Sequence, residues 1–253
     1  MTPSVTTGKP VSRVGQLRRA GVGIDLGGTT LTGVMVDREG KRLAHRTTPA
    51  EVHRGPDAVI ADMVELVDAL LAEASLDRQS QLADRKALIG VGVAAPGPLS
   101  RQSGRIIRSA NLPGWVDVPL CDRLGEALEV PITLENDGNA AAFGEFWLGA
   151  GEDGADLVML TLGTGVGAGV ILNGQILRGH FENAAELGHM IVVHDGLPCP
   201  CGQRGCLEQY ASAGAVARRA AAGLERGDSS SLAAAVKNGA PIASEAVVSA
   251  ARA

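Results

Sequence analysis

The chain has 253 residues, of which 45% are hydrophobic and only 2% aromatic, so it can bury a core packed mainly with Val, Leu, Ile and Ala. Its formal net charge is −5 and its basic residues are scattered, which argues against binding nucleic acid through the phosphate backbone. Because the sequence lacks a run of 18 apolar residues, we expect no membrane-spanning helix, and three clustered cysteines favour a reducing cytoplasm.

The first half of the chain predicts strands around one long helix. Residues 1–20 have no apolar stretch of the kind found in signal peptides, so we expect a disordered tail. A strand should begin near Val22 and lead into a glycine turn, and the apolar positions of Asp57–Ser75 recur at helical spacing. Further extended segments are expected at Val34–Val36, Lys41–Thr48 and Leu88–Ala94.

The second half predicts a similar alternation. Asn173 and Gly174 form a strong hairpin signal after two apolar segments. Strands are expected at Ile132–Glu135, Leu157–Leu162 and Val166–Leu172, and helices at Leu120–Leu128, Gly138–Leu148, Ser212–Gly223, Ser230–Val236 and Ser244–Ala253.

Two glycine turns, each between two strands, are candidates for binding phosphate. Glycines allow backbone N–H groups to approach an anion closely, and threonine hydroxyls add donors. A strand rather than a helix follows each turn, so neither is a dinucleotide-binding turn, and the Gly-Lys-Ser/Thr of a Walker A loop is absent. The candidate phosphate-binding residues are Gly27, Gly28, Thr29 and Thr30 in the first turn and Gly163, Thr164 and Gly165 in the second.

Four potential zinc ligands, His189, Cys199, Cys201 and Cys206, lie close together in the sequence. Three thiolates and one imidazole make a complete tetrahedral set for Zn²⁺, which leaves no open position for an activated water, so this zinc would be structural. A disulfide is the alternative, but Cys199 and Cys201 are too close along the chain to bridge easily. The same segment carries Glu186, three residues before His189, and Glu208. We interpret this clustering as a site for a polyhydroxylated ligand rather than a solvated surface.

Four blocks of the sequence together resemble the ROK family (repressor, open reading frame, kinase), and within it the bacterial glucokinases. They occur in family order and span roughly residues 21 to 215. The blocks are Gly23–Thr29 (GIDLGGT), Ala95–Pro98 (APGP) with Asn111–Trp115 (NLPGW), Glu135–Ala141 (ENDGNAA), and Leu162–Gly167 (LGTGVG) leading into the cysteine segment.

The resemblance implies an α/β fold, the two-lobed actin-like ATPase (ribonuclease H-like) architecture of sugar kinases. By the family pattern, Asp137 is the catalytic base and Asp25 the acid near the phosphates and Mg²⁺ of Mg-ATP. The sugar contacts that it implies are Asn111, Asn136, Asp137, Glu186, His189 and Glu208. The residues alone also allow Asp137 to be the N-cap of the helix that follows.

The implied activity is ATP-dependent phosphorylation of an aldohexose at the 6-hydroxyl, with glucose as the first candidate. N-acetylmannosamine or another hexose, or a non-catalytic sugar-binding ROK protein, is the alternative; a ROK repressor would need a helix-turn-helix domain ahead of Gly21. We expect lobes at residues 21–118 and 119–253, a homo-oligomer such as a dimer, and a second lobe that is short at its C-terminus. That shortness implies measurable sugar binding, weak ATP binding and self-association.

Overall fold

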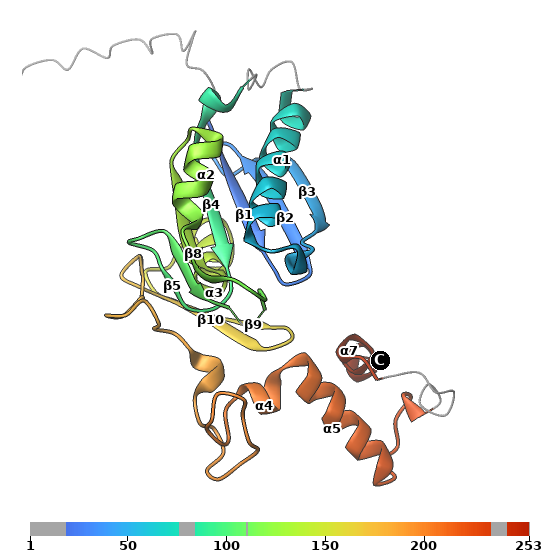
Figure 1. Cartoon of the computed structure of the whole chain (residues 1–253). Coiled ribbons are helices and arrows are strands. Elements are labelled where there is room, and N and C mark those ends of the chain that lie inside the picture. Colours follow the sequence, from blue (N-terminus) through green and yellow to red (C-terminus); the bar gives the residue numbers. More distant parts are fainter. Residues whose placement is uncertain (1–18, 76–83, 110, 234–241, 253) are drawn as a thin grey trace, which may run out of the picture.

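The computed structural model describes residues 19–75, 84–109, 111–233 and 242–252 (Figure 1). A five-stranded sheet in the order β3-β2-β1-β4-β8 forms the centre of the first lobe. β1 pairs antiparallel with β2 and parallel with β4, and β4 pairs parallel with β8. The strands are β1 (Ala20–Leu26), β2 (Thr30–Val36), β3 (Arg42–Pro49), β4 (Leu88–Ala95) and β8 (Ile132–Asn136).

Two helices, α1 (Pro56–Ser75) and α2 (Leu120–Leu128), lie against one face of this sheet. The alternation of side chains in β1 explains why, since Val22, Ile24 and Leu26 are buried on that face. α1 turns its apolar stripe to the same core, which accounts for the helical spacing seen in the sequence. The core of the first lobe is therefore aliphatic, as the composition predicts.

The expected boundary between the lobes at residues 118/119 is wrong. β8 extends the first sheet by pairing with β4, from Val91 opposite Ile132 to Ala95 opposite Asn136. α2 packs on β8 and on α1, so it too belongs to the first lobe. The first lobe therefore continues to Asn136, and Asp137 begins the first element beyond it.

The second lobe is built on a three-stranded sheet in the order β11-β10-β9, against which the helix α3 packs. Asn173 and Gly174 both have positive φ in the turn between β10 and β11, which confirms the hairpin read from the sequence. The bounds are α3 (Asp137–Leu148), β9 (Leu157–Leu162), β10 (Val166–Leu172) and β11 (Gln175–Ile176).

Smaller elements complete the fold. A third sheet, in the order β5-β6-β7, follows β4 and was not expected from the sequence. Figure 1 shows α4, α5 and α7 at the end of the molecule opposite α1 and α2. The remaining bounds are β5 (Leu99–Ser100), β6 (Arg105–Arg108), β7 (Val116–Val118), η1 (Val52–Arg54), η2 (Arg85–Ala87), η3 (Leu187–His189), α4 (Glu208–Ala211), α5 (Ala213–Glu225) and α7 (Ser244–Arg252).

Two expectations concern residues that the structure describes only in part. The expected tail at 1–20 falls almost wholly outside the described residues, as does the end of the helix expected at Ser230–Val236. Within the described part of the chain, no helix is both long and apolar enough to cross a membrane.

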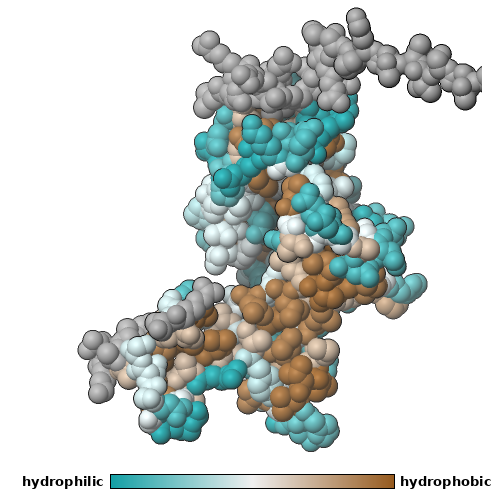
Figure 2. All heavy atoms as spheres, turned by 180° about the vertical axis from the view of Figure 1, so that it is seen from behind, coloured by the Kyte–Doolittle hydropathy of each residue, from teal (hydrophilic) through white to brown (hydrophobic). Residues whose placement is uncertain are grey.

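Large apolar side chains lie exposed on the second lobe, and Figure 2 shows them gathered in brown over its surface. β9 is an edge strand of its sheet, and its alternate side chains Val158, Leu160 and Leu162 are 61%, 44% and 64% exposed. An apolar edge strand with unpaired backbone groups promotes association between chains.

We therefore expect the chain to self-associate as its concentration rises. Leu160→Lys should shift the population toward monomer, because a charge on this face opposes strand pairing. The measurement is sedimentation velocity over a concentration series, with Gln102→Lys, an exposed change in the turn between β5 and β6, as the control. Equal association of both variants would show that β9 is not the associating surface.

Candidate active site

A cavity of about 820 Å³ opens along the face of the first sheet that α1 and α2 leave uncovered. Its wall is formed by β1, β2, β4 and β8, and by the first turns of α3. Asp25 of β1 and Asp137 of α3 both line it. The structure thus brings together two carboxylates that are 112 positions apart in the sequence (137 − 25).

Asp137 stands at the first position of α3. Asn136, and not Asp137, is the N-cap, since its Oδ1 accepts a hydrogen bond from the backbone N–H of Asn139 at 3.2 Å. The suggestion that Asp137 caps this helix is therefore wrong. Its Oδ1 accepts from the N–H of Gly138 at 2.8 Å, so the carboxylate is oriented at the helix start while lining the cavity.

Both cavity aspartates are harder to ionise than an ordinary aspartate. Partial burial raises the pKa of Asp137, and its hydrogen bonds to backbone N–H groups and to Asn136 only partly oppose this. Burial also raises the pKa of Asp25, and the neighbouring negative charge of Asp137 raises it further. Both side chains stay accessible to solvent at the cavity wall, so water moderates the rise.

The raised pKa of Asp137 predicts a stability effect of defined sign. A carboxyl group whose pKa is higher in the folded than in the unfolded state destabilises the fold once it ionises. Asp137→Asn should therefore raise the thermal unfolding midpoint at neutral pH, in buffer without added Mg²⁺. The gain should vanish when the pH falls below the ordinary aspartate pKa of about 4. Calorimetry across this pH range tests the sign, and a gain that persists in acid would contradict it.

The two glycine turns adopt the compact geometry expected of them. In the first, the N–H of Gly27 donates to the carbonyl of Thr30 at 2.9 Å, and a Cβ on Gly28 would lie 2.9 Å from the carbonyl oxygen of Asn111. The absence of a side chain at Gly28 thus lets this turn lie directly against Asn111. In the second turn, the N–H of Gly163 donates to the carbonyl of Gly165 at 3.0 Å.

Two further glycines pack the segments that carry Asp137 and His189 against the same strand, β10. A Cβ on Gly138 would lie 2.4 Å from the carbonyl oxygen of Ala168, and one on Gly188 would lie 2.0 Å from that of Val166. Gly138 and Gly188, the chain neighbours of Asp137 and His189, therefore pack against backbone positions of β10 that are two residues, or about 7 Å, apart.

Glu208 is also attached to β10, because its Oε2 accepts from the backbone N–H of Val166 at 3.0 Å. Glu186 is exposed immediately before η3. Of the predicted site residues, Asp25 and Asp137 line the cavity, whereas Asn111, Asn136, Glu186, His189, Glu208 and the residues of the two glycine turns do not. Glu186, His189 and Glu208 form a second group, on the segment that lies against β10.

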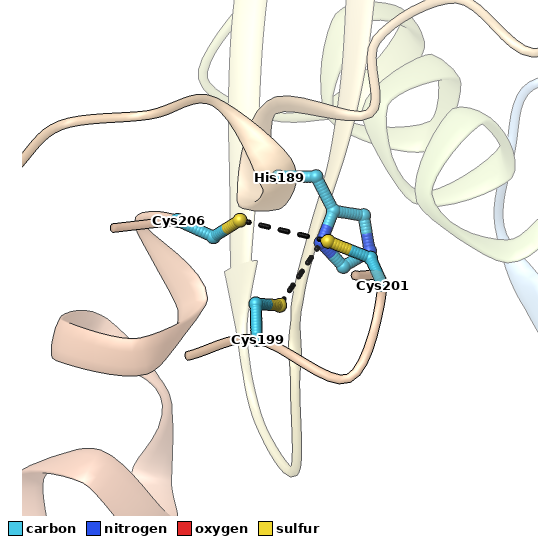
Figure 3. Close-up of side chains that lie close together, drawn as sticks. All are labelled: His189, Cys199, Cys201 and Cys206. Carbon is cyan, nitrogen blue, oxygen red and sulfur yellow. Dashed lines mark hydrogen bonds between the residues drawn. The ribbon is translucent and has the colours of Figure 1, made fainter. Parts of the chain in front are cut away.

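His189, Cys199, Cys201 and Cys206 converge, as Figure 3 shows, with their ligand atoms all within 4.8 Å of one another. The Sγ atoms of Cys201 and Cys206 are 3.6 Å apart, and Sγ of Cys199 is 3.7 Å from Nδ1 of His189. Two thiolates bound at about 2.3 Å to one tetrahedral zinc ion would be about 3.8 Å apart, so the donor spacing fits this metal. The cysteines are free thiols, and a sulfur separation of 3.6 Å is far longer than a disulfide.

The backbone around these ligands is closely hydrogen bonded. The N–H of Cys199 donates to the carbonyl of Gln203 at 2.9 Å, and that of Gly205 donates to Leu197 at 2.8 Å. Gly205 has a φ of +81°, and a Cβ there would lie 1.8 Å from the carbonyl oxygen of Val193. Only glycine fits this position.

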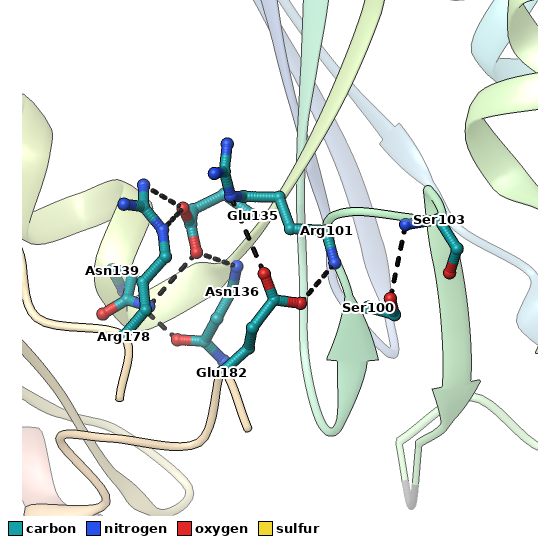
Figure 4. A network of polar contacts seen from close by, with 8 residues as sticks. All are labelled: Ser100, Arg101, Ser103, Glu135, Asn136, Asn139, Arg178 and Glu182. Carbon is teal, nitrogen blue, oxygen red and sulfur yellow. Dashed lines mark hydrogen bonds and ion pairs between the residues drawn. The ribbon is translucent and has the colours of Figure 1, made fainter. Parts of the chain in front are cut away.

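A polar network next to Asp137 could not be predicted from the sequence. Glu135, the residue before Asn136, forms an ion pair with Arg178 at 2.7 Å (Figure 4). A second pair joins Arg101 of the β5–β6 turn to Glu182 of the loop after β11. Glu135 stands in one of the four sequence blocks, but nothing in the sequence marks Arg178 as its partner.

The two lobes, each with a glycine turn between antiparallel strands, and the pair of aspartates between them define an actin-like α/β fold of the sugar-kinase type. The family model of the ROK family matches residues 21–253. The chain therefore belongs to the ROK family.

Individual relatives agree with this assignment. The chain is 37% identical over 213 residues to a glucokinase of Halalkalibacterium halodurans, which covers 84% of this chain and 62% of the relative. It is also 31% identical over 191 residues to the xylose repressor of Bacillus subtilis, covering 76% of this chain and 47% of the repressor. The chain thus spans less than two thirds of the length of these curated relatives.

A solved structure of a ROK family glucokinase from Streptomyces griseus, in complex with glucose and AMPPNP, superimposes with a TM-score of 0.69 at 34% identity. The match covers 92% of this chain and 71% of that one.

Proposed function

We propose that this protein transfers the γ-phosphoryl group of ATP to the 6-hydroxyl of an aldohexose, most readily glucose. The observation that carries the proposal is the pair formed by Asp137 and Asp25 in one cavity, with Asp137 oriented at the start of α3. The similarity to glucokinases of 37% identity supports the same reaction class.

In the proposed reaction, Asp137 is the general base. Its carboxylate takes the proton of the sugar hydroxyl as the oxygen–phosphorus bond forms, while the bond to the bridging oxygen of ADP breaks. The raised pKa of Asp137 makes it a stronger base than an ordinary aspartate, although it must be ionised to act. We assign the sugar contacts to Asn111, Asn136, Glu186, His189 and Glu208, and the hydrogen bond from Val166 N–H to Oε2 of Glu208 leaves its Oε1 for a sugar hydroxyl.

The phosphate side of the site is assigned to the two glycine turns and Asp25. Backbone N–H groups within Gly27–Thr30 and Gly163–Gly165 are suited to donate hydrogen bonds to phosphate oxygens, because glycine allows close approach, while those of Gly27 and Gly163 close the two turns. Mg²⁺, when bound with ATP, supplies charge neutralisation for the transferred group, and Asp25 is the residue that we propose to hold it.

We further propose that His189, Cys199, Cys201 and Cys206 bind one structural zinc ion. Their donor separations of 3.6 and 3.7 Å support this, as does the match of three thiolates and one imidazole to zinc. The role assigned to the metal is mechanical: it would hold the loop between Glu186 and Glu208 against β10.

One alternative substrate and one alternative function are each supported by an observation. N-acetylmannosamine or another hexose could be the substrate, because His180–Asn183 places a bulky and charged segment before Glu186. A sugar-binding protein without catalysis is the second alternative, and the similarity to a xylose repressor favours it. The presence of Asp137 favours the kinase, since a protein that only binds sugar has little use for a carboxylate base.

A panel of hexoses with Mg-ATP and coupled detection of ADP separates these possibilities. The kinase proposal requires sugar-dependent ADP release with glucose as the preferred substrate. Preference for another hexose would change the substrate alone. Saturable glucose binding without ADP release would instead support the non-catalytic alternative.

A further inference from the structure

Glu135 is the most heavily hydrogen-bonded carboxylate beside the candidate active site. Its Oε1 accepts from the backbone N–H of Asn136 at 3.0 Å and from Nδ2 of Asn139 at 3.1 Å. Its Oε2 accepts from Nε and Nη2 of Arg178 at 2.9 and 2.7 Å. The side chains of Glu135 and Arg178 are only 19% and 29% exposed, so this ion pair is less screened than a surface pair.

The hydrogen bonds to Oε1 of Glu135 fix residues on both sides of Asp137 in the chain. Asn136 precedes it and caps α3, while Asn139 follows it and is 97% buried. One carboxylate oxygen therefore fixes the chain immediately before Asp137 and the first turn immediately after it. The orientation of Asp137 thus depends on the orientation of the Glu135 carboxylate.

Arg178 fixes that carboxylate from a different part of the molecule. It follows β11 and starts the loop that leads to Glu186, and its carbonyl accepts from the N–H of Ala184 at 3.0 Å, which closes the loop. Within this loop Glu182 accepts from the backbone N–H of Arg101 at 2.7 Å (Figure 4). The loop before Glu186 is thus anchored at two points, and one anchor is the carboxylate that orients Asp137.

We infer that Arg178 is a positioning residue: its paired hydrogen bonds to Glu135 set the start of α3, and hence Asp137, relative to the loop that carries Glu186. A guanidinium suits this task because its rigid planar group lets Nε and Nη2 donate together to the one oxygen Oε2, leaving Oε1 to Asn136 and Asn139, which the single nitrogen of an ammonium cannot reproduce. The inference rests on the proposed kinase function and deepens it by adding a residue that acts on turnover through Asp137.

The test compares Arg178→Met with Arg178→Lys and with a matched control. Arg178→Met should lower kcat by about 10-fold or more, since small displacements of a reacting group are costly, and leave KM for ATP unchanged. Arg178→Lys keeps the charge but not the paired geometry, so its kcat should fall between that of Arg178→Met and the wild type. The control is Arg85→Met, because Arg85 also donates two hydrogen bonds to one carboxylate, from Nε to Oδ1 and from Nη2 to Oδ2 of Asp68 at 2.8 and 2.6 Å, away from the cavity. It should lose stability without losing kcat.

A second measurement does not depend on activity. Hydrogen exchange of the peptide spanning the end of β8 and the first turns of α3 should quicken in Arg178→Met and not in Arg85→Met. Glu135→Gln combined with Arg178→Met should lower kcat no further than the more damaging single change, because both remove the same contact.

The outcomes distinguish the inference from the function on which it rests. If the wild-type chain phosphorylates none of the sugars, the proposed function fails, and exchange alone decides the positioning role. If the wild type is active but Arg178→Met matches Arg85→Met in both kcat and exchange, the positioning role is wrong and the kinase function stands. Independent, multiplicative losses in the double variant would also overturn it.

Discussion

Replacing Asp137 with Asn should lower kcat by about 10²-fold or more while leaving glucose affinity nearly unchanged. The side chain keeps its size and its acceptor for Gly138 N–H, but it can no longer take the proton of the sugar hydroxyl. Steady-state kinetics give kcat, and calorimetric titration with glucose gives the affinity. The expected separation of the two quantities is the signature of a group that acts in the transition state.

The matched control for this change is Asp122→Asn. Asp122 is likewise in the first turn of a helix, α2, and it is exposed on the far side of the sheet. Both substitutions remove a negative charge from the first turn of a helix, so the control reproduces the loss of charge without touching the cavity. Turnover by Asp137→Asn close to that of Asp122→Asn would exclude Asp137 as the base.

Replacing Cys206 with Ser should abolish stoichiometric zinc binding and destabilise the second lobe by about 4 kcal/mol or more, the range typical of losing a structural metal. Cys206 is fully buried between Cys201 and the start of α4, so an unmatched hydroxyl there would also be poorly accommodated. Because the loop also carries Glu186 and Glu208, glucose affinity should fall with the metal. Elemental analysis, thermal unfolding and glucose titration of the same preparations provide the three readouts.

Cys121→Ser is the control for the cysteine prediction. Cys121 lies on α2 in the first lobe and packs near Gly104, far along the chain from the cluster. It should retain zinc and glucose affinity. Wild-type protein that is purified without chelator and carries no zinc would contradict the metal assignment, as would full glucose affinity in Cys206→Ser.

The helices and strands of this fold can be predicted from the sequence wherever they depend on local side-chain periodicity or turn chemistry. Leu120–Leu128, Leu157–Leu162 and Val166–Leu172 have in the structure the bounds expected for them. The lobe boundary was misplaced because strand pairing is not local: nothing between Val118 and Ile132 reveals that β8 will pair with β4. The short strands β5, β6 and β7 were missed for the same reason, since two to four residues carry little periodicity.

The same distinction between local and long-range contacts decides which site residues could be predicted. The four candidate zinc ligands could be recognised because they are close in sequence, and three thiols with one imidazole are a donor set typical of zinc. Arg178 could not be predicted, because its partner Glu135 is 43 residues away and an isolated arginine has no distinguishing pattern. The roles of Asp25 and Asp137 came only from the family resemblance, and that the two line one cavity is known only from the structure, since 112 positions separate them (137 − 25).

The most direct test of the account is the chemical fate of the γ-phosphoryl group when the wild-type chain is incubated with Mg-ATP and glucose. Phosphorus NMR should show ADP and a phosphomonoester on the 6-position of glucose in equal amounts, and neither should accumulate with Asp137→Asn. Formation of inorganic phosphate without a sugar ester, or an unchanged rate of ester formation in Asp137→Asn, would contradict the claim that Asp137 directs phosphoryl transfer to a hexose hydroxyl.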